Sequence, residues 1–241
     1  MENTPNIFHF KKFDVVNHRS AMKVNTDGVL LGALVTISPE DRSFLDIGTG
    51  TGTIALMVAQ RSEAGRVDAI DIDEPSIEEA AMNFANSRWA DRFHTHHASL
   101  DEFSQALGCQ YDVIVSNPPY FEDSLWAPQE RRNNARHTAT GLSYREIIEF
   151  AAQNLTQNGR LALVLPSETE LGLTRHARMN GLHLHKITRV RTVPRKDPKR
   201  IIAEFARERC AEPVDTILTI QNEGQYTQEY LSLMKDFYLF A

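Results

Sequence analysis

The segment 117–120 directly follows an apolar stretch of the chain. It contains residue types that could act on a planar, hydrogen-bonding substrate. Segment 111–115 is short, apolar and β-branched, which predicts a buried strand, and the prolines after Asn117 must end its pairing. Pro118 disfavours the helical backbone conformation for Asn117, so the backbone of Asn117 is expected to be extended. This gives its side-chain amide a defined direction. Tyr120 adds an aromatic ring. Because an Asn-Pro pair is also an ordinary turn, this stretch alone leaves both interpretations open.

Three glycines, Gly48, Gly50 and Gly52, follow another apolar strand (43–48) at the start of a helix. Glycine permits a tight turn and lets backbone N–H groups approach a ligand closely, which predicts a loop for a nucleotide-type cofactor. The spacing G-x-G-x-G differs from the G-x-G-x-x-G typical of dinucleotide sites. Asp46, at the strand tip, would repel a pyrophosphate but attract the amino group of S-adenosylmethionine, which is therefore the predicted cofactor.

A second acidic position ends the next predicted strand (66–72). Asp71 lies 19 residues beyond Gly52, where a carboxylate can accept both ribose hydroxyls. Asp73 is close enough to compete for this role, and Asp71 is preferred because the apolar strand runs directly into it. Together with Asn117, these groups are expected on the carboxyl edge of one sheet, where open α/β folds bind ligands.

Strands and helices alternate along the chain, which predicts an α/β fold with a doubly wound, mostly parallel sheet and helices on both faces. Two strand-like segments, 182–193 and 200–208, flank a Pro/Lys/Asp turn and are predicted to form an antiparallel hairpin at the end of the sheet. The remaining predicted elements are strands at 92–98 and 159–166, helices at 52–61, 75–89 and 143–154, and a helix that starts at 28 with Asp27 as N-cap.

Composition narrows the function classes. A chain of 241 residues suffices for one sizeable α/β domain, so 1–241 is interpreted as a single domain. The first residues show no signal-peptide pattern, and no window approaches the roughly 20 apolar residues that span a bilayer, so a cytoplasmic protein without a membrane partner is expected. Neither the two cysteines, Cys109 and Cys210, nor the His-rich stretch 94–97 indicates a metal site.

Charge is distributed unevenly. The formal net charge is −6, which argues against a protein that coats nucleic acid indiscriminately. Segment 186–200 nevertheless carries seven basic residues and one acid, so its own charge is +6 and that of the remainder is −12. Such a local basic stripe suits selective phosphate contact, although a solvated hairpin has the same composition, and the sequence leaves both open.

The motifs DIGTGTG (46–52), AIDID (69–73) and NPPY (117–120), in this order, resemble those of class I S-adenosylmethionine-dependent methyltransferases that methylate amino groups. The N-terminal stretch 10–34, which contains MKVNTDGVLLGA, is similar to a narrower group. That group is the bacterial tRNA1(Val) adenine-N6 methyltransferase family, which modifies the adenine just 3′ of the anticodon. ARHT (135–138), the basic hairpin, and the YTQEY and DFYL pieces agree with it, so the resemblance covers nearly the whole chain. It implies a Rossmann-like class I methyltransferase fold.

The resemblance also implies roles in catalysis. The Asn117 side-chain carbonyl and the Pro118 backbone carbonyl would accept the two N–H groups of the adenine amine and stabilise the positive charge that develops on its nitrogen. Tyr120 would stack on the base, while Pro119 and Phe121 would complete an apolar wall. The base must leave its stack to enter such a pocket, which is easier in an anticodon loop than in a duplex.

Further roles concern the cofactor and the tRNA. The resemblance implies that residues 1–42 form an extension over cofactor and substrate, with Lys23 and Thr26 near the cofactor. Ser99 stands where an aspartate often touches the cofactor adenine, and Asn25 where glycine is expected. The basic segment would hold tRNA phosphates without reading sequence, through Arg189, Arg191, Arg195 and Lys196.

Four other functions remain open at this stage. Methylation of a protein glutamine would use the same Asn-Pro-Pro-Tyr geometry, but is expected to need a larger N-terminal recognition domain than the 42 residues before the first strand. Ribosomal-RNA guanine N2 methylation fits the N-terminal motif poorly. An NAD-dependent oxidoreductase would favour the other glycine spacing. A non-catalytic RNA-binding protein would have no need of intact Asn117 and Tyr120.

Overall fold

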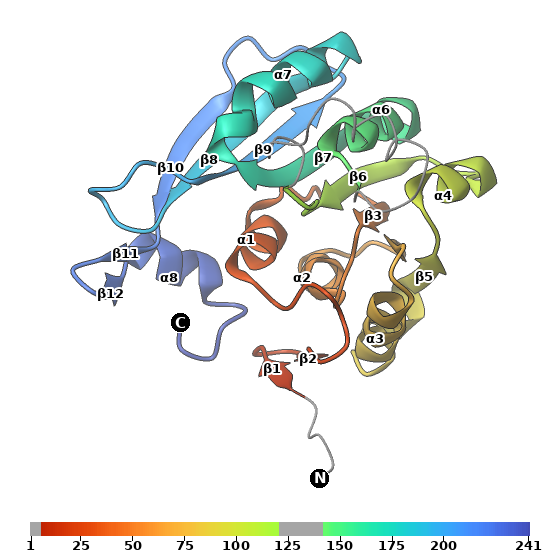
Figure 1. Ribbon diagram of the computed structural model, residues 1–241, viewed down its shortest axis with the longest axis horizontal. Coiled ribbons are helices and arrows are strands. Elements are labelled where there is room, and N and C mark those ends of the chain that lie inside the picture. Colours follow the sequence, from red (N-terminus) through yellow and green to blue (C-terminus); the bar gives the residue numbers. More distant parts are fainter. Residues whose placement is uncertain (1–5, 121–141) are drawn as a thin grey trace, which may run out of the picture.

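The computed structural model describes residues 6–120 and 142–241, and it confirms an α/β fold built on an eight-stranded sheet (Figure 1). Across the sheet the strand order is β10-β8-β9-β7-β6-β3-β4-β5. The strands span β3 (Ser43–Ile47), β4 (Arg66–Asp71), β5 (Phe93–His97), β6 (Tyr111–Ser116), β7 (Leu155–Pro166), β8 (His183–Arg191), β9 (Arg200–Ala206) and β10 (Val214–Thr219). The helices span α1 (Thr26–Leu34), α2 (Thr53–Arg61), α3 (Glu74–Ala85), α4 (Leu100–Ala106), α6 (Tyr144–Asn154), α7 (Glu170–Met179) and α8 (Gln228–Met234).

The strand directions place the site. Strands β3, β4, β5, β6 and β7 pair in parallel, whereas β9 runs antiparallel to both β7 and β8. Strand β3 lies between β4 and β6, so the chain order reverses there and a crevice opens beyond the carboxyl ends of β3 and β6. The glycine loop follows β3 and the Asn-Pro-Pro-Tyr segment follows β6, so both reach that crevice.

Helices cover the sheet in two layers (Figure 1). Side chains of α1, α2 and α3 belong to one buried apolar cluster, and those of α4, α6 and α7 belong to a second cluster on the opposite face. Central parallel strands are buried on both faces, which explains why they are continuous apolar runs instead of alternating ones. In β6, Val113, Ile114 and Val115 are all at most 1% exposed.

The two ends of the described chain meet below this core. An N-terminal pair of short strands, β1 (Ile7–His9) and β2 (Asp14–Val16), lies near the C-terminal segment that follows α8 (Figure 1). Phe10 forms a backbone bridge with Tyr238, and the Lys11 N–H donates to the Phe237 carbonyl over 2.8 Å. A further hairpin, β11 (Gln221–Asn222) with β12 (Gln225–Tyr226), precedes α8.

Several sequence predictions need correction. The first helix begins at Thr26, and Asn25, not Asp27, is its N-cap, since the Asn25 side chain accepts the Gly28 N–H over 2.9 Å. Asn25, at a position where glycine was expected, thus satisfies a backbone N–H group at the start of α1. The antiparallel pairing of 182–193 with 200–208 is confirmed, but β10 was not predicted and lies outside β8, so the hairpin does not end the sheet. Helices α4, α7 and α8 were not predicted either.

The His-rich stretch is a strand, as predicted, and has an acidic partner that the sequence did not reveal. His96 Nε2 lies 2.7 Å from Asp68 Oδ1 on the neighbouring strand β4. Asp68 is fully buried and also accepts from Tyr111 and Arg66, and these contacts hold its pKa at about 2 against the opposing effect of burial. This cluster ties three strands together and has the features of a structural network.

The turn from β3 into α2 is packed tightly against α3. Gly52 caps α2 with φ of 80°, a backbone conformation that favours glycine. A Cβ atom at this position would lie 2.4 Å from Cε1 of Phe84, which is itself 2% exposed in the core. The turn can therefore hold its shape only with glycine at this position.

We expect Gly52→Ala to destabilise the fold by about 3 kcal/mol, because backbone strain and overpacking add. For a chain of this size that lowers the melting temperature by roughly 6–12 °C, measurable by calorimetry. Gly65→Ala is the matched control, since a Cβ there meets nothing within 4 Å and no positive φ is involved. Equal melting temperatures for the two variants would contradict the packing argument.

Candidate active site

Asn117 forms the floor of the crevice at the end of β6. The residue before it, Ser116, donates from its hydroxyl to the Ile47 carbonyl of β3 over 2.7 Å, which fixes the end of the strand. Asn117 is 6% exposed, so its amide is held between the sheet edge and the segment above it. Pro118 is buried and Pro119 half-buried, and together they keep the chain from continuing the sheet pairing.

The glycine loop borders Asn117 on the β3 side. Gly48 and Gly50 have φ of 70° and 55°, which turn the backbone sharply after the strand. Asp46 lies beneath the loop, 1% exposed, and one carboxylate oxygen accepts from the Thr49 hydroxyl over 2.8 Å. Its other oxygen is buried without a hydrogen-bond partner. Burial raises the pKa of Asp46 to about 7, so this carboxyl titrates near neutral pH.

Asp71 and Asp73 have different environments. One oxygen of Asp71, the last residue of β4, accepts the Gly50 N–H of the glycine loop over 2.8 Å, and the other accepts the Asp73 N–H over 2.9 Å. Burial raises its pKa above the usual value. Asp73 instead caps α3, accepting from both the backbone N–H and the hydroxyl of Ser76. The geometry supports the preference for Asp71 at the cofactor, while helix capping occupies Asp73.

Two buried polar side chains on α3 hold the N-terminal segment over the loop. The Glu79 carboxylate accepts the backbone N–H groups of His18, Arg19 and Ser20 over 2.9, 2.6 and 3.1 Å. Asn83 exchanges hydrogen bonds with the backbone of Val16 and donates to the Thr51 carbonyl of the glycine loop. No role was predicted for Glu79 or Asn83. Both lie at helical spacing beside the buried Ile77, Ala80 and Phe84, and this pattern indicates polar side chains that face the core.

The covered crevice is narrow. Residues from the N-terminal segment, the glycine loop and Asn117 enclose a cavity of only ≈ 30 Å³, enough for about one water molecule. Met22 narrows it, because its sulfur lies 3.4 Å from the Asn117 Nδ2 atom. Lys23, Gly48, Gly50 and Asn117, which were predicted to contact the cofactor, line this cavity. Its volume is smaller than the several hundred Å³ typical of sites for nucleotide-sized ligands.

The side chains of three residues that were predicted to contact the cofactor, Lys23, Thr26 and Ser99, have other surroundings in the structure. The Lys23 side chain donates to the His18 carbonyl, and Thr26 is an exposed first residue of α1. The Ser99 hydroxyl caps α4 in a reciprocal pair with Glu102, accepting its N–H over 3.2 Å and donating to its carboxylate over 2.7 Å. Cofactor contacts from Lys23, Thr26 and Ser99 stay predictions.

Tyr120 lies beside Asn117 and joins it to distant parts of the chain. Its hydroxyl oxygen is 2.7 Å from Asn117 Oδ1 and 3.0 Å from Asp27 Oδ2. Arg200 donates from Nε to the same Asp27 oxygen over 2.8 Å, and its guanidinium carbon lies 4.9 Å from the centre of the Tyr120 ring. Burial, and then Asp27, raise the pKa of Tyr120, so its hydroxyl keeps its proton. Phe121 and the ARHT stretch lie outside the described residues.

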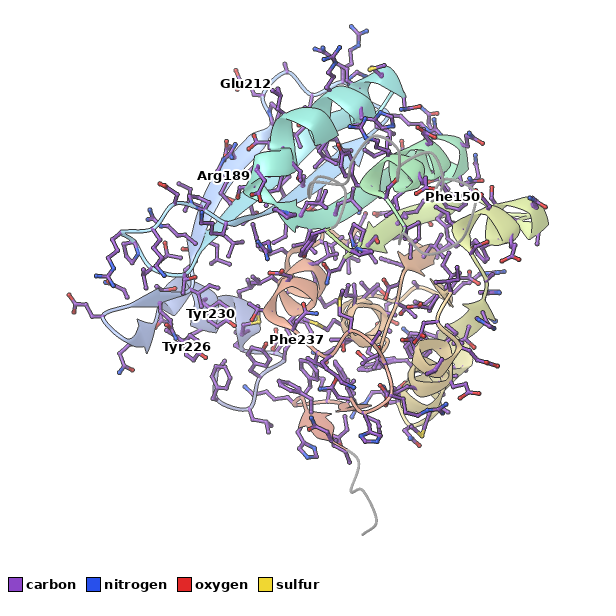
Figure 2. All side chains as sticks on the ribbon, viewed as in Figure 1. Phe150, Arg189, Glu212, Tyr226, Tyr230 and Phe237 are labelled. Atoms are coloured by element: carbon purple, nitrogen blue, oxygen red, sulfur yellow. The ribbon has the colours of Figure 1, made fainter. Side chains whose placement is uncertain are left out.

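The four predicted phosphate-binding residues differ in availability. Arg189, labelled in Figure 2, donates to both oxygens of Glu170 and to the Asp215 carboxylate, so a phosphate would have to compete with two carboxylates. Arg191 is half-buried and donates to the Thr219 hydroxyl over 2.8 Å. Arg195 and Lys196 are exposed in the turn between β8 and β9. Of the four, these two are the most accessible to RNA.

The described residues contain neither a metal-binding cluster nor a membrane-spanning helix. Residues 6–120 and 142–241 contain no group of three or more His, Cys, Asp or Glu side chains arranged to hold a metal ion. Within the same ranges, no helix has the length and apolar character needed to cross a bilayer.

Known proteins resemble this chain over nearly its whole length. The methyltransferase small domain model matches residues 20–183, from the covering segment to the start of β8. A tRNA1(Val) (adenine(37)-N6)-methyltransferase from Flavobacterium johnsoniae is 42% identical over 234 residues, which are 97% of this chain and 99% of that protein. One of the same name from Parabacteroides distasonis is 44% identical over 233 residues, 96% of this chain and 97% of that protein. This chain belongs to the tRNA1(Val) (adenine(37)-N6)-methyltransferase family.

Solved structures agree on the fold of this family member. A predicted O-methyltransferase from Agrobacterium tumefaciens superposes with a TM-score of 0.68 at 18% identity, covering 88% of this chain and 96% of that one. A methyltransferase from Pyrococcus furiosus gives 0.57 at 21% identity, with 80% and 89% covered. At such identities the likeness concerns architecture alone, and it confirms the Rossmann-like class I methyltransferase fold.

Proposed function

We propose that this protein transfers a methyl group from S-adenosylmethionine to N6 of the adenine 3′ of the anticodon in a valine tRNA, in the cytoplasm where tRNA is found. The observation that carries the proposal is the buried Asn117 amide at the carboxyl end of β6, directly beside the glycine loop. Relatives that match nearly the whole chain are named for this activity, which supports the proposal.

The residues present fit the proposed cofactor. Asp46 keeps a buried carboxylate oxygen without a partner, and a carboxylate suits the ammonium group of S-adenosylmethionine. Asp71 uses one acceptor position on each oxygen for backbone N–H groups, which leaves others for the ribose hydroxyls. Gly48 and Gly50 allow the backbone to approach closely. The bound cofactor supplies a methyl group activated by its sulfonium charge.

The chain's own residues address a weak nucleophile. The lone pair of an adenine amine is delocalised into the ring, so the enzyme must favour the pyramidal nitrogen that attacks. The Asn117 side-chain carbonyl and the Pro118 backbone carbonyl accept its two N–H groups, which orients the lone pair and stabilises the positive charge that develops on nitrogen. Tyr120 stacks on the base, with Pro119 at its edge. After transfer the nitrogen carries a surplus proton, which passes to solvent water.

The direct test is methyl transfer from labelled S-adenosylmethionine to total tRNA of a strain that lacks its own adenine modification. We expect N6-methyladenosine in a valine tRNA, identified by nuclease digestion and nucleoside analysis.

Asn117→Ala should slow transfer by about 10²- to 10³-fold, because a group that stabilises the transition state is lost. Its dissociation constant for S-adenosylmethionine should stay within about twofold, since the amide mainly binds the target amine.

Asn222→Ala, in the exposed β11 hairpin, is the matched control and should transfer at the wild-type rate. Transfer by Asn117→Ala at that same rate would refute the mechanism. Label in a protein or in ribosomal RNA, with none in tRNA, would keep the fold and cofactor but assign the enzyme to one of the alternative substrates. RNA binding without any methyl transfer would identify a non-catalytic RNA-binding protein.

A pH dependence follows from Asp46, whose pKa burial raises to about 7. Below that pH the carboxyl is neutral and attracts the cofactor's ammonium weakly, so affinity for S-adenosylmethionine should rise about tenfold from pH 5.5 to 7.5. Asp46→Asn should abolish the rise in calorimetric titrations.

The stability of the free protein should depend on pH in the opposite direction. The fold favours the protonated carboxyl, so stability should fall as pH rises from about 4 to about 7, and unchanged pH profiles in Asp46→Asn would contradict both expectations.

The exposed turn between β8 and β9 generates a prediction about RNA binding. Replacing Arg195 and Lys196 together by glutamine should weaken tRNA binding and reduce the slope of log affinity against log salt by about one for each lost phosphate contact. The control replaces Arg175 and Arg178, two exposed arginines on α7, in the same way. Filter binding at several salt concentrations measures the slopes. Equal losses in both pairs would mean that the turn makes no specific contact.

A further inference from the structure

Four residues from three distant segments of the chain, the proposed catalytic Asn117 among them, are joined by side-chain contacts. Asp27 comes from the first turn of α1, Asn117 and Tyr120 follow β6, and Arg200 begins β9. Arg200 reaches this edge because β9 is antiparallel: its first residue pairs with Pro166, the last residue of β7. The amino end of β9 therefore lies where the parallel strands have their carboxyl ends.

All the contacts converge on two oxygen atoms. The Tyr120 hydroxyl is within hydrogen-bonding distance of both Asn117 Oδ1, at 2.7 Å, and Asp27 Oδ2, at 3.0 Å. It has a single hydrogen, so it donates to one of them at a time. Arg200 donates to that same Asp27 oxygen over 2.8 Å and partly neutralises it, while its guanidinium lies over the Tyr120 ring. The hydroxyl thus has two acceptors with a fixed spacing.

We infer that Asp27, held by Arg200, is a positioning residue that takes over the Tyr120 hydroxyl when the target amine replaces it on Asn117. The inference rests on the proposed function, in which Asn117 Oδ1 accepts an amine N–H. In the structure the Tyr120 hydroxyl lies at hydrogen-bonding distance from that oxygen. Without a second acceptor, the arriving amine would either compete with the hydroxyl or leave it unpaired in a partly buried site, at a cost in free energy.

Asp27 removes that cost. Once the amine donates to Asn117, the hydroxyl turns to a carboxylate oxygen at nearly the same distance, and a charge-assisted bond replaces the neutral one. The hydroxyl therefore donates one hydrogen bond both before and after the amine arrives. Arg200 keeps the carboxylate in place and covers one face of the Tyr120 ring, which defines the ring plane against which a base can stack.

A double-mutant cycle on Asp27 and Tyr120 tests this. With saturating S-adenosylmethionine and tRNA, Asp27→Asn should slow single-turnover methyl transfer about tenfold in the wild-type background. Tyr120→Phe keeps the ring but removes the hydroxyl, so adding Asp27→Asn to it should change the rate by less than about twofold. An equal loss in both backgrounds would overturn the inference, because a general structural effect of Asp27 on α1 does not depend on the hydroxyl.

Arg200 provides an independent second measurement. Arg200→Lys keeps the positive charge but loses the planar group and the Nε donor. We expect a transfer rate about fivefold lower, with the KM for tRNA and the dissociation constant for S-adenosylmethionine each within about twofold of wild type. A raised KM at an unchanged rate would identify Arg200 as a phosphate contact instead and overturn its role beside Asp27.

These outcomes stay separate from failure of the proposed function. If wild-type protein transfers no methyl group to tRNA, the proposed substrate is wrong, and the same cycle can be run on whichever planar amine does accept the label. If wild-type protein methylates tRNA but the Asp27 and Tyr120 effects are additive, only the inference fails.

Discussion

The attachment of the N-terminal segment to α3 is the interaction on which the site depends. Three backbone N–H groups of this segment have no strand or helix to pair with, and the buried Glu79 carboxylate satisfies them together. A buried carboxylate without such donors would be strongly destabilising, so the segment and the helix stabilise each other. Asn83 extends the attachment to the glycine loop through the Thr51 carbonyl. The covering segment, the loop and α3 therefore behave as one unit.

This unit explains how a shallow sheet edge becomes an enclosed site. Asp46 is buried beneath the glycine loop, at 1% exposed. Asn117, at the end of β6, lies beside Met22 of the covering segment and is 6% exposed. Enclosure lowers the local dielectric, which raises the pKa of Asp46 and strengthens the hydrogen bonds around Asn117. The cavity left between the covering segment and the loop is ≈ 30 Å³, and Met22 lines it beside Asn117.

The sequence predicted those parts of the fold whose residues act locally. Apolar runs, glycine spacing and the Asn-Pro-Pro-Tyr stretch located the central strands, the loop and the floor of the site, since period, turn chemistry and proline restriction are properties of neighbouring residues. Contacts between distant segments were not predictable in this way. Asp27 was interpreted as a helix cap, and its bonds to Tyr120 and Arg200 depend on β9 running antiparallel and on its place beside β7. Arg189 was predicted to bind phosphate because basic residues are in excess around it in the sequence. Its pairing with Glu170 and Asp215 could not be predicted from composition.

The antiparallel direction of β9 has a consequence for how such an enzyme can diverge. Because β8 ends and β9 begins at the catalytic edge, their connecting turn, 192–199, projects beside the site without contributing to the apolar core. Insertions, deletions and charge changes in this turn can accumulate at little cost to folding, since surface connections tolerate them. Arg200, the first residue of the strand, marks where that freedom ends. The turn can thus change in length and charge while the contacts of Arg200 with Asp27 and Tyr120 are preserved.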